Sequence, residues 1–450
     1  MRVRHVVSVC VAALTVLVAV PAVAGAVPPQ YPNGWTFSLS GLRQMPFSVD
    51  TRAFCKGPAG SVYEVALSQT TGYYAGISRF RVSDGAELKS WTYPATPGAA
   101  VIPYAAASDA AGNLFVAVET QSGTHDWVVL KFDRSGRRLW RKSYDSGNGQ
   151  DTPYGMVVDH HGAVIVAGTS AGAGGYDTAV VKWSGSGRLK WKRMISGAGL
   201  DLVTAVAVDA DDNVYAAGDS ENGGTGRAVL RSWTTAGRKR WTASAVNPLG
   251  GMPAWRYIAI KGTSLYVAGQ STGVASTSHF MAMKYTTSGK RAWSGIKQLT
   301  NDHGAWVTGL AVDRAGAAVV VGYSYDSGPS GEDQGVVWKL TSRGPTAWAQ
   351  PFANAAWPHD GEFDSVGVDS KNRIYAGGGQ MVTAGTGNLL IVRYSPSGAE
   401  QAMWRSDGQQ SGYCVLNHLL VLSDTRVLAA GKVAGNGSNA AVYRAGTTSP

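Results

Sequence analysis

The chain is poor in cysteine, in charge and in residues that favour helices. It has 3 cysteines and 16% charged residues in a length of 450, and Leu and Glu are sparse beside 58 glycines. It contains no CxxC pair and no Cys/His cluster, so no structural zinc site is indicated. Val, Thr, Tyr and Trp are plentiful instead. This composition predicts strands joined by many turns.

Long apolar runs are confined to the N-terminus. A basic segment, Met1–Arg4, precedes an apolar run, Val6–Val20, that is short for a membrane span. Small residues then offer cleavage after Ala24 or Ala26. We interpret residues 1–26 as a signal peptide, with an uncleaved anchor as the alternative. We therefore expect a secreted, extracellular protein without a stable membrane span, either free or associated with the cell wall.

A repeat of about fifty residues runs through the rest of the chain. One motif is a glycine turn followed by tryptophan, as in "DRSGRRLW" and "SGSGRLKW". A second motif, typified by "DADDNVYAAG" from Asp209, falls between successive copies of the first. The tryptophans are spaced by 56, 49, 51, 50, 52, 55 and 56 residues and are Trp35, Trp91, Trp140, Trp191, Trp241, Trp293, Trp348 and Trp404.

Each unit reads as four short strands. Residues 203–245 contain "VTAVAVD", "NVYAAGDS", "RAVLRSW" and "RKRWTASA" in that order. Four strands in about fifty residues are typical of one β-propeller blade. No segment after the signal peptide keeps a 3.6-residue periodicity, which excludes helical solenoids. A degenerate first unit at Gly57 brings the count to eight blades, or to seven if that unit is only a cap.

The two ends of the repeat region predict how the ring closes. The last unit supplies a third strand, Asn439–Gly446, and no fourth. The segment Trp35–Ser40 has no other strand to complete. Pairing the two as a 3+1 clasp leaves no open sheet edge at the seam. We therefore predict an all-β protein with one domain, residues 27–450, folded as a monomeric propeller of eight four-stranded blades.

The phrase "D..GN.YVAG", followed by "D..V.K" and "G....W", resembles the SBBP-type bacterial β-propeller repeat. The resemblance covers residues 35–446 and implies the fold rather than an activity, because that family is mostly exported repeat proteins without an agreed reaction. The part "D..SG...W" also resembles the tryptophan-docking motif of quinoprotein dehydrogenases, which are eight-bladed propellers. The adjacent cysteine pair that packs on the quinone there is absent here, so we expect neither a quinone nor another cofactor.

Strand order distributes the loops over two faces. The turns between first and second strands and between third and fourth strands are tight and share one face, the tight-turn face. The connections from fourth to first strands and from second to third strands are longer and share the other, the long-loop face. Long loops on a rigid scaffold commonly carry function. We therefore look for a site on the long-loop face.

Aromatic and acidic residues gather where the chain enters the innermost strands on this face. Such aromatic platforms with carboxylates at a channel mouth suit a sugar or peptide ligand. The alternative is that the aromatics fill the centre of the ring and the aspartates cap strand starts. Tyr104, Tyr154 and Trp255 occupy nearly equivalent positions. The ligand-binding candidates, with His359 and Asp364 beside them, are Tyr104, Tyr154, Trp255, Trp306, Trp357, Asp151, Asp201, Asp302, His303 and Asp360.

No complete catalytic constellation accompanies these residues. Carboxylate and imidazole groups are present at 302–303 and 359–360, but neither a serine elbow nor an HExxH motif occurs. "DADDN" at Asp209 lacks the distal glutamate of a calcium loop and indicates an Asx turn. We assign no catalytic residue, metal ligand or cofactor. The favoured function is a non-catalytic propeller that binds a glycan, peptide or protein. The alternative is a glycan lyase or hydrolase at the same channel mouth.

Basic residues concentrate on the fourth strands, and the formal net charge is +10. One interpretation is a cell-envelope scaffold that adheres to an anionic polymer. The other is that Lys and Arg on outer strands prevent edge-to-edge aggregation. Nucleic-acid binding is not expected of an exported chain without a matching motif. The residues are Arg137, Arg138, Arg141, Lys142, Arg188, Lys190, Lys192, Arg193, Arg238, Lys239, Arg240, Lys290 and Arg291.

Export leaves two cysteines, Cys55 and Cys414, in the first and last units, which the clasp makes neighbours. An oxidising compartment favours a disulfide between them. The register argues against it, because Cys55 falls late in its innermost strand and Cys414 just before its own. That offset is roughly 20 Å at the usual strand rise, whereas a bridge needs Cα atoms within about 7 Å. The sequence leaves the pairing open.

Overall fold

The computed structural model describes residues 49–445 except for 69–71, 84, 95–99, 121–124, 173–174, 198, 223–224, 273–277, 300–303, 326–332, 353–360, 384–385, 406–413, 425 and 434–438. The predicted signal peptide and the predicted clasp strand lie outside the described residues. Within them, regular structure consists of strands, and no helix has the length and apolar character needed to cross a membrane.

The first four blades contain β1 (Val49–Lys56), β2 (Ser61–Ser68), β3 (Tyr74–Arg81), β4 (Glu87–Tyr93); β5 (Val101–Ser108), β6 (Leu114–Thr120), β7 (Trp127–Phe132), β8 (Arg138–Tyr144); β9 (Asp151–Val158), β10 (Val164–Gly172), β11 (Gly175–Trp183), β12 (Leu189–Ile195); and β13 (Asp201–Val208), β14 (Val214–Asn222), β15 (Thr225–Trp233), β16 (Lys239–Ala245).

The last four contain β17 (Met252–Lys261), β18 (Ser264–Thr272), β19 (Ser278–Thr286), β20 (Arg291–Gln298); β21 (Gly304–Val312), β22 (Ala318–Tyr325), β23 (Asp333–Leu340), β24 (Thr346–Pro351); β25 (Gly361–Val368), β26 (Ile374–Thr383), β27 (Thr386–Tyr394), β28 (Glu400–Arg405); and β29 (Val415–Ser423), β30 (Arg426–Val433), β31 (Asn439–Ala445).

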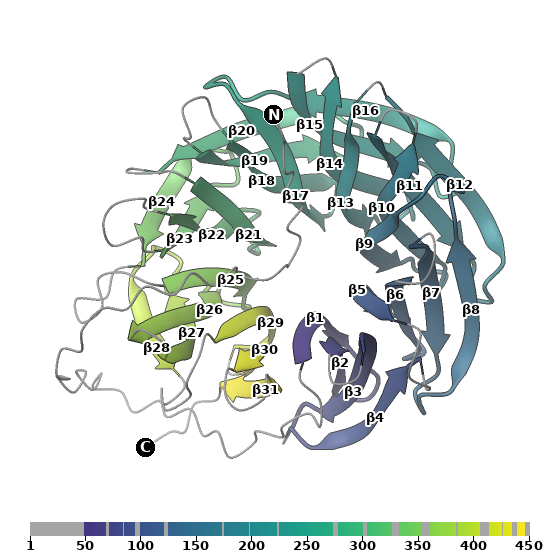
Figure 1. The fold of residues 1–450 in the computed structure, drawn as a ribbon. Helices are drawn as coiled ribbons and strands as arrows, with labels where there is room; N and C mark the ends of the chain where they lie inside the picture. The colour runs from purple at the N-terminus through teal and green to yellow at the C-terminus, as the bar shows by residue number, and fades with distance from the viewer. Residues whose placement is uncertain are drawn as a thin grey trace.

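These strands form a β-propeller, and the predicted fold class is confirmed. Seven blades are four-stranded antiparallel sheets and the eighth has three strands among the described residues. Blades 6 and 7 are joined by a single parallel pair, Gln334 with Gly361. The first strand of each blade lies innermost and the fourth at the outer edge of the ring (Figure 1). The count is therefore eight.

The hydrophobic core is divided among the spaces between neighbouring blades. The middle strands supply it: every residue of β2 and of β7 is buried. The outer strand β8 has only its last residue buried. One cluster joins Phe115 and Trp127 of blade 2 to Val164 and Val181 of blade 3. Each blade is thus stabilised by burying both faces of its middle strands against its neighbours.

A β-bulge recurs in the innermost strands and explains one glycine of the repeat. In blade 4 the register shifts between Val203 and Ala205, which leaves Thr204 as the extra residue. The bulge brings the Leu202 carbonyl against Gly218, where a Cβ atom would collide with it. The glycine that ends "VYAAG" is therefore required by close backbone approach.

In blades 2 to 6 the repeat tryptophan is hydrogen-bonded to the glycine turn of the next blade. Trp191 Nε1 donates a hydrogen bond to the Thr235 carbonyl of blade 4 at 3.0 Å. Gly237 in the same turn has φ +80°, and a Cβ atom there would lie 2.7 Å from the Trp191 ring. The glycine thus serves both the turn and the contact. The same bond joins Trp140 to Gly185, Trp241 to Thr287, Trp293 to Ser342 and Trp348 to Pro396.

A buried ion pair accompanies this contact on the tight-turn face. Lys182 Nζ lies 2.8 Å from Asp159 Oδ2 and also donates to Thr235 Oγ1 at 2.9 Å. Equivalent pairs join Lys131 to Asp109 and Lys339 to Asp313, each at 3.2 Å. The aspartate is the first residue of the turn between first and second strands. In blade 4, Asp209 Oδ1 accepts from the N–H groups of Asp211 and Asn213, so the Asx turn is confirmed.

The ring closes between blade 8 and blade 1. Strands β1–β4 lie beside β29–β31 (Figure 1). Asn417 Nδ2 donates to the Thr51 carbonyl at 2.9 Å, and Leu428 packs in one cluster with Val62 and Phe80. Cys55 and Cys414 are free thiols. Cys55 packs against the cluster between blades 1 and 2, and Cys414 lies in the cluster between blades 7 and 8.

Candidate ligand-binding face

The bulge sets the register of the residues at the channel mouth on the long-loop face. Antiparallel order puts the starts of the first and third strands, and the ends of the second and fourth, on this face. The bulged position is equivalent from blade to blade. It is occupied by Arg52, Tyr104, Tyr154, Thr204, Arg256, Thr308 and Asp364.

Tyr104 and Tyr154 are brought together, as equivalent positions of blades 2 and 3. Their rings make a T-shaped contact with centroids 5.7 Å apart. Both residues are half-buried. Burial raises the pKa of both phenols above the ordinary value, and the Glu119 carboxylate adds to the rise at each of them. The Tyr104 hydroxyl is hydrogen-bonded to Glu119, and that of Tyr154 to Thr169 and Thr152.

Glu119, at the end of β6, is a buried acceptor beside this pair that the sequence did not reveal. Its side chain is 1% exposed. Its carboxylate lies 2.8 Å from His125 Nδ1 and accepts hydrogen bonds from Gln150 Nε2 at 3.3 Å and Thr152 Oγ1 at 3.1 Å. His125 and Gln150 come from the two long connections that flank β7 and β8, and Thr152 lies at the start of β9. The network therefore fixes the loops of blades 2 and 3 against each other.

Trp306, at the start of β21, presents its ring to solvent. The residue is 39% exposed. Its indole stacks on Tyr323 of β22 with centroids 5.5 Å apart and an interplanar angle of 21°. A Cβ atom on Gly304 would collide with the indole, so the glycine makes room for the ring. Strand pairing and stacking together hold this aromatic surface in a fixed orientation.

Carboxyl groups surround this aromatic pair. Burial raises the pKa of Tyr323, and Glu362, Asp333 and Asp364 add to the rise. Burial and the same two neighbouring carboxylates, Glu362 and Asp333, hold the pKa of Asp364 well above its usual range. Asp364 Oδ2 has no hydrogen-bond partner among the described residues. Blade 6 and blade 7 thus form an acidic, aromatic corner of the channel mouth.

Trp255 lies elsewhere than the sequence analysis assumed. It is 0% exposed and packs with Tyr215 and Leu230 in the core between blades 4 and 5. The bulge makes Arg256, not Trp255, the equivalent of Tyr104, and a shift of one residue turns a strand side chain to the opposite face. Arg256 Nη1 lies 3.4 Å from Asp219 Oδ1. Burial raises the pKa of Asp219 to about 6 despite the nearby arginines.

The two predicted aspartates that the structure describes are also buried. Asp201 is 3% exposed and pairs with Arg231 Nη2 at 2.7 Å. Asp151 is 0% exposed and accepts from the N–H groups of Ser146 at 2.7 Å and Ala171 at 3.2 Å. Asp151 therefore caps the loop before β9, and Asp201 is the ion-pair partner of Arg231 in β15. The candidates Asp302, His303, Trp357 and Asp360, and His359 beside them, lie outside the described residues.

Asp151 also belongs to a group of three carboxylates. Oxygen atoms of Asp126, Asp145 and Asp151 lie within 4.8 Å of one another on the long-loop face. Oxygen ligands of this kind suit a hard cation such as Ca²⁺. Asp145 Oδ1 accepts from the N–H of Gly147 at 2.6 Å, and Asp151 is bonded by its own loop. The group is thus already engaged in ordering the connection from β8 to β9.

The basic residues lie where the sequence placed them. Strands β8, β12, β16 and β20 contain Lys and Arg but no Asp or Glu, and they form the outer edge of blades 2 to 5 (Figure 1). We call this surface the basic belt. Leu139 and Leu189 are interleaved with the charges and are 43% and 54% exposed. The belt therefore offers both charge and apolar contact to a partner.

Comparison with known proteins supports the fold and no more. No model of a known protein family and no curated protein matches the chain. Sqt1 from Chaetomium thermophilum is 11% identical, with TM-score 0.53, over 90% of this chain and 100% of that one. The β-propeller domain of the Trilobed protease from Pyrococcus furiosus is 8% identical, with TM-score 0.43, over 81% and 96%. A eukaryotic initiation factor is 12% identical, with TM-score 0.46, over 90% and 92%.

Proposed function

We propose that this chain is an exported, non-catalytic propeller that binds a glycan at the channel mouth of the long-loop face. The observation that carries the proposal is Trp306, 39% exposed and held flat on Tyr323. A rigidly held indole offers the apolar face of a sugar ring a large contact area at little cost in conformational entropy. The carboxyl groups of Glu362 and Asp364 lie near Tyr323, the residue on which the indole stacks, and make this corner acidic.

Features on other blades support the same interpretation. Across the channel from blade 6, Tyr104 and Tyr154 form a second aromatic pair with Glu119 as acceptor (Figure 1). Export is supported by the signal-like residues 1–26 and by the resemblance to the SBBP-type repeat. The propeller itself provides the rigid ring on which long loops are commonly used for binding.

Isothermal titration calorimetry against a panel of soluble polysaccharides tests the proposal. W306A should weaken binding of the retained polysaccharide by about tenfold or more, as expected for a central aromatic contact. W306F keeps a flat ring and should lose less. L139A, which removes an equally exposed side chain from the basic belt, should bind like the unaltered protein.

Unfolding measurements on the same variants separate binding from packing. Truncating a ring that is 39% exposed and stacked on Tyr323 should lower the unfolding free energy by about 1–2 kcal/mol. A loss of about 3 kcal/mol or more would instead show that Trp306 is a core residue packed in the centre of the propeller. Unchanged polysaccharide binding by W306A would also reject the proposal.

A glycan lyase or hydrolase at the same mouth is the second candidate, and Asp364 favours it. Burial and its carboxylate neighbours raise the pKa of this acid, so it holds a proton at pH values where most carboxyl groups have lost theirs. Carboxyl groups with pKa values pushed apart are typical of general acid and base pairs in glycoside hydrolysis. Release of new reducing ends from a bound polysaccharide, abolished in D364N, would establish this activity. Binding without turnover would favour the first function.

The basic belt suggests a further attachment, to an anionic polymer of the cell envelope. Its charges are exposed and of one sign along four adjacent blades. Adhesion of this kind should decline as salt screens the charges, because the Debye length falls to about 3 Å at 1 M. If adhesion to cell-wall material is unchanged at high salt, the basic belt is not the surface that attaches the protein.

A further inference from the structure

Two consecutive histidines on the tight-turn face contact a carboxylate of the next blade. His160 and His161 lie in the turn between β9 and β10, and Asp212 lies in the turn between β13 and β14. His160 Nδ1 is 2.7 Å from Asp212 Oδ1, and His161 Nδ1 is 2.5 Å from Asp212 Oδ2. The carboxylate therefore bridges blade 3 and blade 4 through both of its oxygens.

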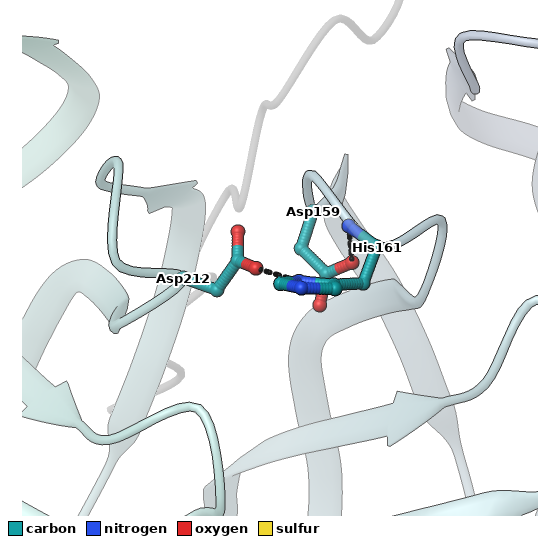
Figure 2. A group of neighbouring side chains, drawn as sticks. All are labelled: Asp159, His161 and Asp212. Carbon is teal, nitrogen blue, oxygen red and sulfur yellow. Dashed lines mark hydrogen bonds and ion pairs between the residues drawn. The ribbon is translucent and has the colours of Figure 1, made fainter.

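A second carboxylate lies on the other side of the His161 ring. Ligand atoms of Asp159, His161 and Asp212 lie within 4.8 Å of one another. Figure 2 shows the His161 ring near both acids, with the backbone N–H of His161 donating to Asp159 Oδ1. His161 is 86% exposed at its side chain, whereas those of Asp159 and Asp212 are 2% and 3% exposed. The group combines buried anions with an open side toward solvent.

Comparison with the other turns shows that the histidines are not needed for the turn itself. The backbone N–H of His160 donates to Asp212 Oδ1 at 3.0 Å. Between blades 6 and 7 an amide side chain takes the place of the carboxylate, because the N–H of Arg314 donates to Asn372 Oδ1 at 2.9 Å. Blades 7 and 8 repeat it with Asp424, which accepts from the N–H of Ser370 at 2.9 Å. Neither of these turns contains a histidine. The imidazoles of blade 3 are therefore additional to a contact that the fold makes without them.

The ion-pair partners of Asp212 differ from those of Asp109, Asp159 and Asp313 in the equivalent turns. Asp109, Asp159 and Asp313 each pair with a lysine of the third strand. Among the described residues, the ion pairs of Asp212 are with the two histidines alone. The buried carboxylate thus has ligand-type neighbours in place of a permanent cation.

We propose that Asp159, His161 and Asp212 form a binding site for a divalent cation of the zinc class, linking blade 3 to blade 4. One imidazole nitrogen and two carboxylates are common zinc ligands, and the exposed side leaves room for water as the fourth. His160 holds the second oxygen of Asp212, and Lys182 holds the second oxygen of Asp159. These contacts orient both acids toward the cation. The site is independent of glycan binding on the opposite face.

Titration of the full chain with Zn²⁺ after treatment with a chelator tests the proposal. Calorimetry should show one saturable site that H161A and D212N each weaken at least tenfold. Both variants keep the turn, because Ala111 and Ala315 occupy the position of His161, and Asn372 that of Asp212. Mg²⁺ should not compete, since the imidazole favours zinc.

D424N is the matched control, because Asp424 caps a turn in the same way without a histidine. It should bind Zn²⁺ like the unaltered protein. Zn²⁺ should also raise the unfolding temperature of the unaltered protein and of D424N, but not of H161A, because it binds only the folded state. Absence of a saturable site, or full affinity in both H161A and D212N, would overturn the proposal. The histidines would then be hydrogen-bond partners of Asp212 only.

Discussion

The indole of Trp191 and the backbone of Gly237 are in direct contact across the boundary between blades 3 and 4. A Cβ atom on Gly237 would lie 2.7 Å from the ring, and the residue has φ +80°. G237A should therefore lower the unfolding free energy by about 2–4 kcal/mol, through left-handed backbone strain and displacement of the ring. Urea unfolding measures this loss.

Gly162 supplies the matched control. It has φ +74°, but no atom lies within 4 Å of the position of an added Cβ. G162A should therefore show the backbone cost alone, about 1–2 kcal/mol. Equal losses in the two variants would show that contact with the tryptophan adds nothing to the requirement for glycine.

A second prediction concerns the buried acid Glu64 of blade 1. It is 0% exposed, and Thr51 Oγ1 donates to its Oε1 at 2.6 Å. Burial raises its pKa from 4.5 to about 7, although the Thr51 hydroxyl opposes the shift. The folded state therefore holds this proton more tightly than the unfolded chain, and stability falls as pH rises from about 4.5 to 7. The loss from this group approaches roughly 3 kcal/mol above pH 7.

The comparison of E64Q with the unaltered protein isolates this group from all others. The variant should gain stability relative to the unaltered protein as pH rises from 4.5 to 7, because glutamine carries no charge to bury. Denaturant unfolding at several pH values measures the difference. A difference that stays constant over that range would show that Glu64 titrates normally.

The third prediction concerns the clasp, whose N-terminal strand lies outside the described residues. Blade 8 has three strands among those described, and β31 pairs with β30. Removing residues 27–40 from the mature chain should abolish cooperative unfolding, because the last blade would lose its outer strand at the seam. Thermal unfolding followed by circular dichroism checks this. If the truncated chain unfolds at the same temperature and as cooperatively as the intact one, residues 27–40 do not form the predicted clasp strand.

The sequence was sufficient for the fold because the fold is repetitive. The interval between glycine turns and tryptophans predicted the blades, and the pairing of Trp191 with Thr235 and Gly237 shows why that spacing recurs. The position of Trp255 was not predictable at the same level. A single bulge shifts the register by one residue, and Trp255 then enters the core while Arg256 takes the place equivalent to Tyr104.

Side chains that meet across blades were the least predictable. Glu119 carries no local motif, and its partners include His125 before β7 and Thr152 at the start of β9 in the next blade. His160 and His161 stand in "DHHGA", the copy of the second motif that contains histidine, but nothing local in the sequence indicated a partner. Their partner Asp212 is 51 residues from His161 and becomes a neighbour only when the blades stack. The sequence therefore predicted no binding site on the tight-turn face.

The most direct test of the account is the location of glycan protection in hydrogen–deuterium exchange. With the retained polysaccharide bound, amides at the starts of β21 and β25, around Trp306 and Glu362, should exchange more slowly. Those of β8 and β12 in the basic belt, and the turn of His161, should be unaffected. Protection confined to the outer strands or to the tight-turn face, or a panel in which no polysaccharide binds, would contradict a glycan site at the long-loop mouth.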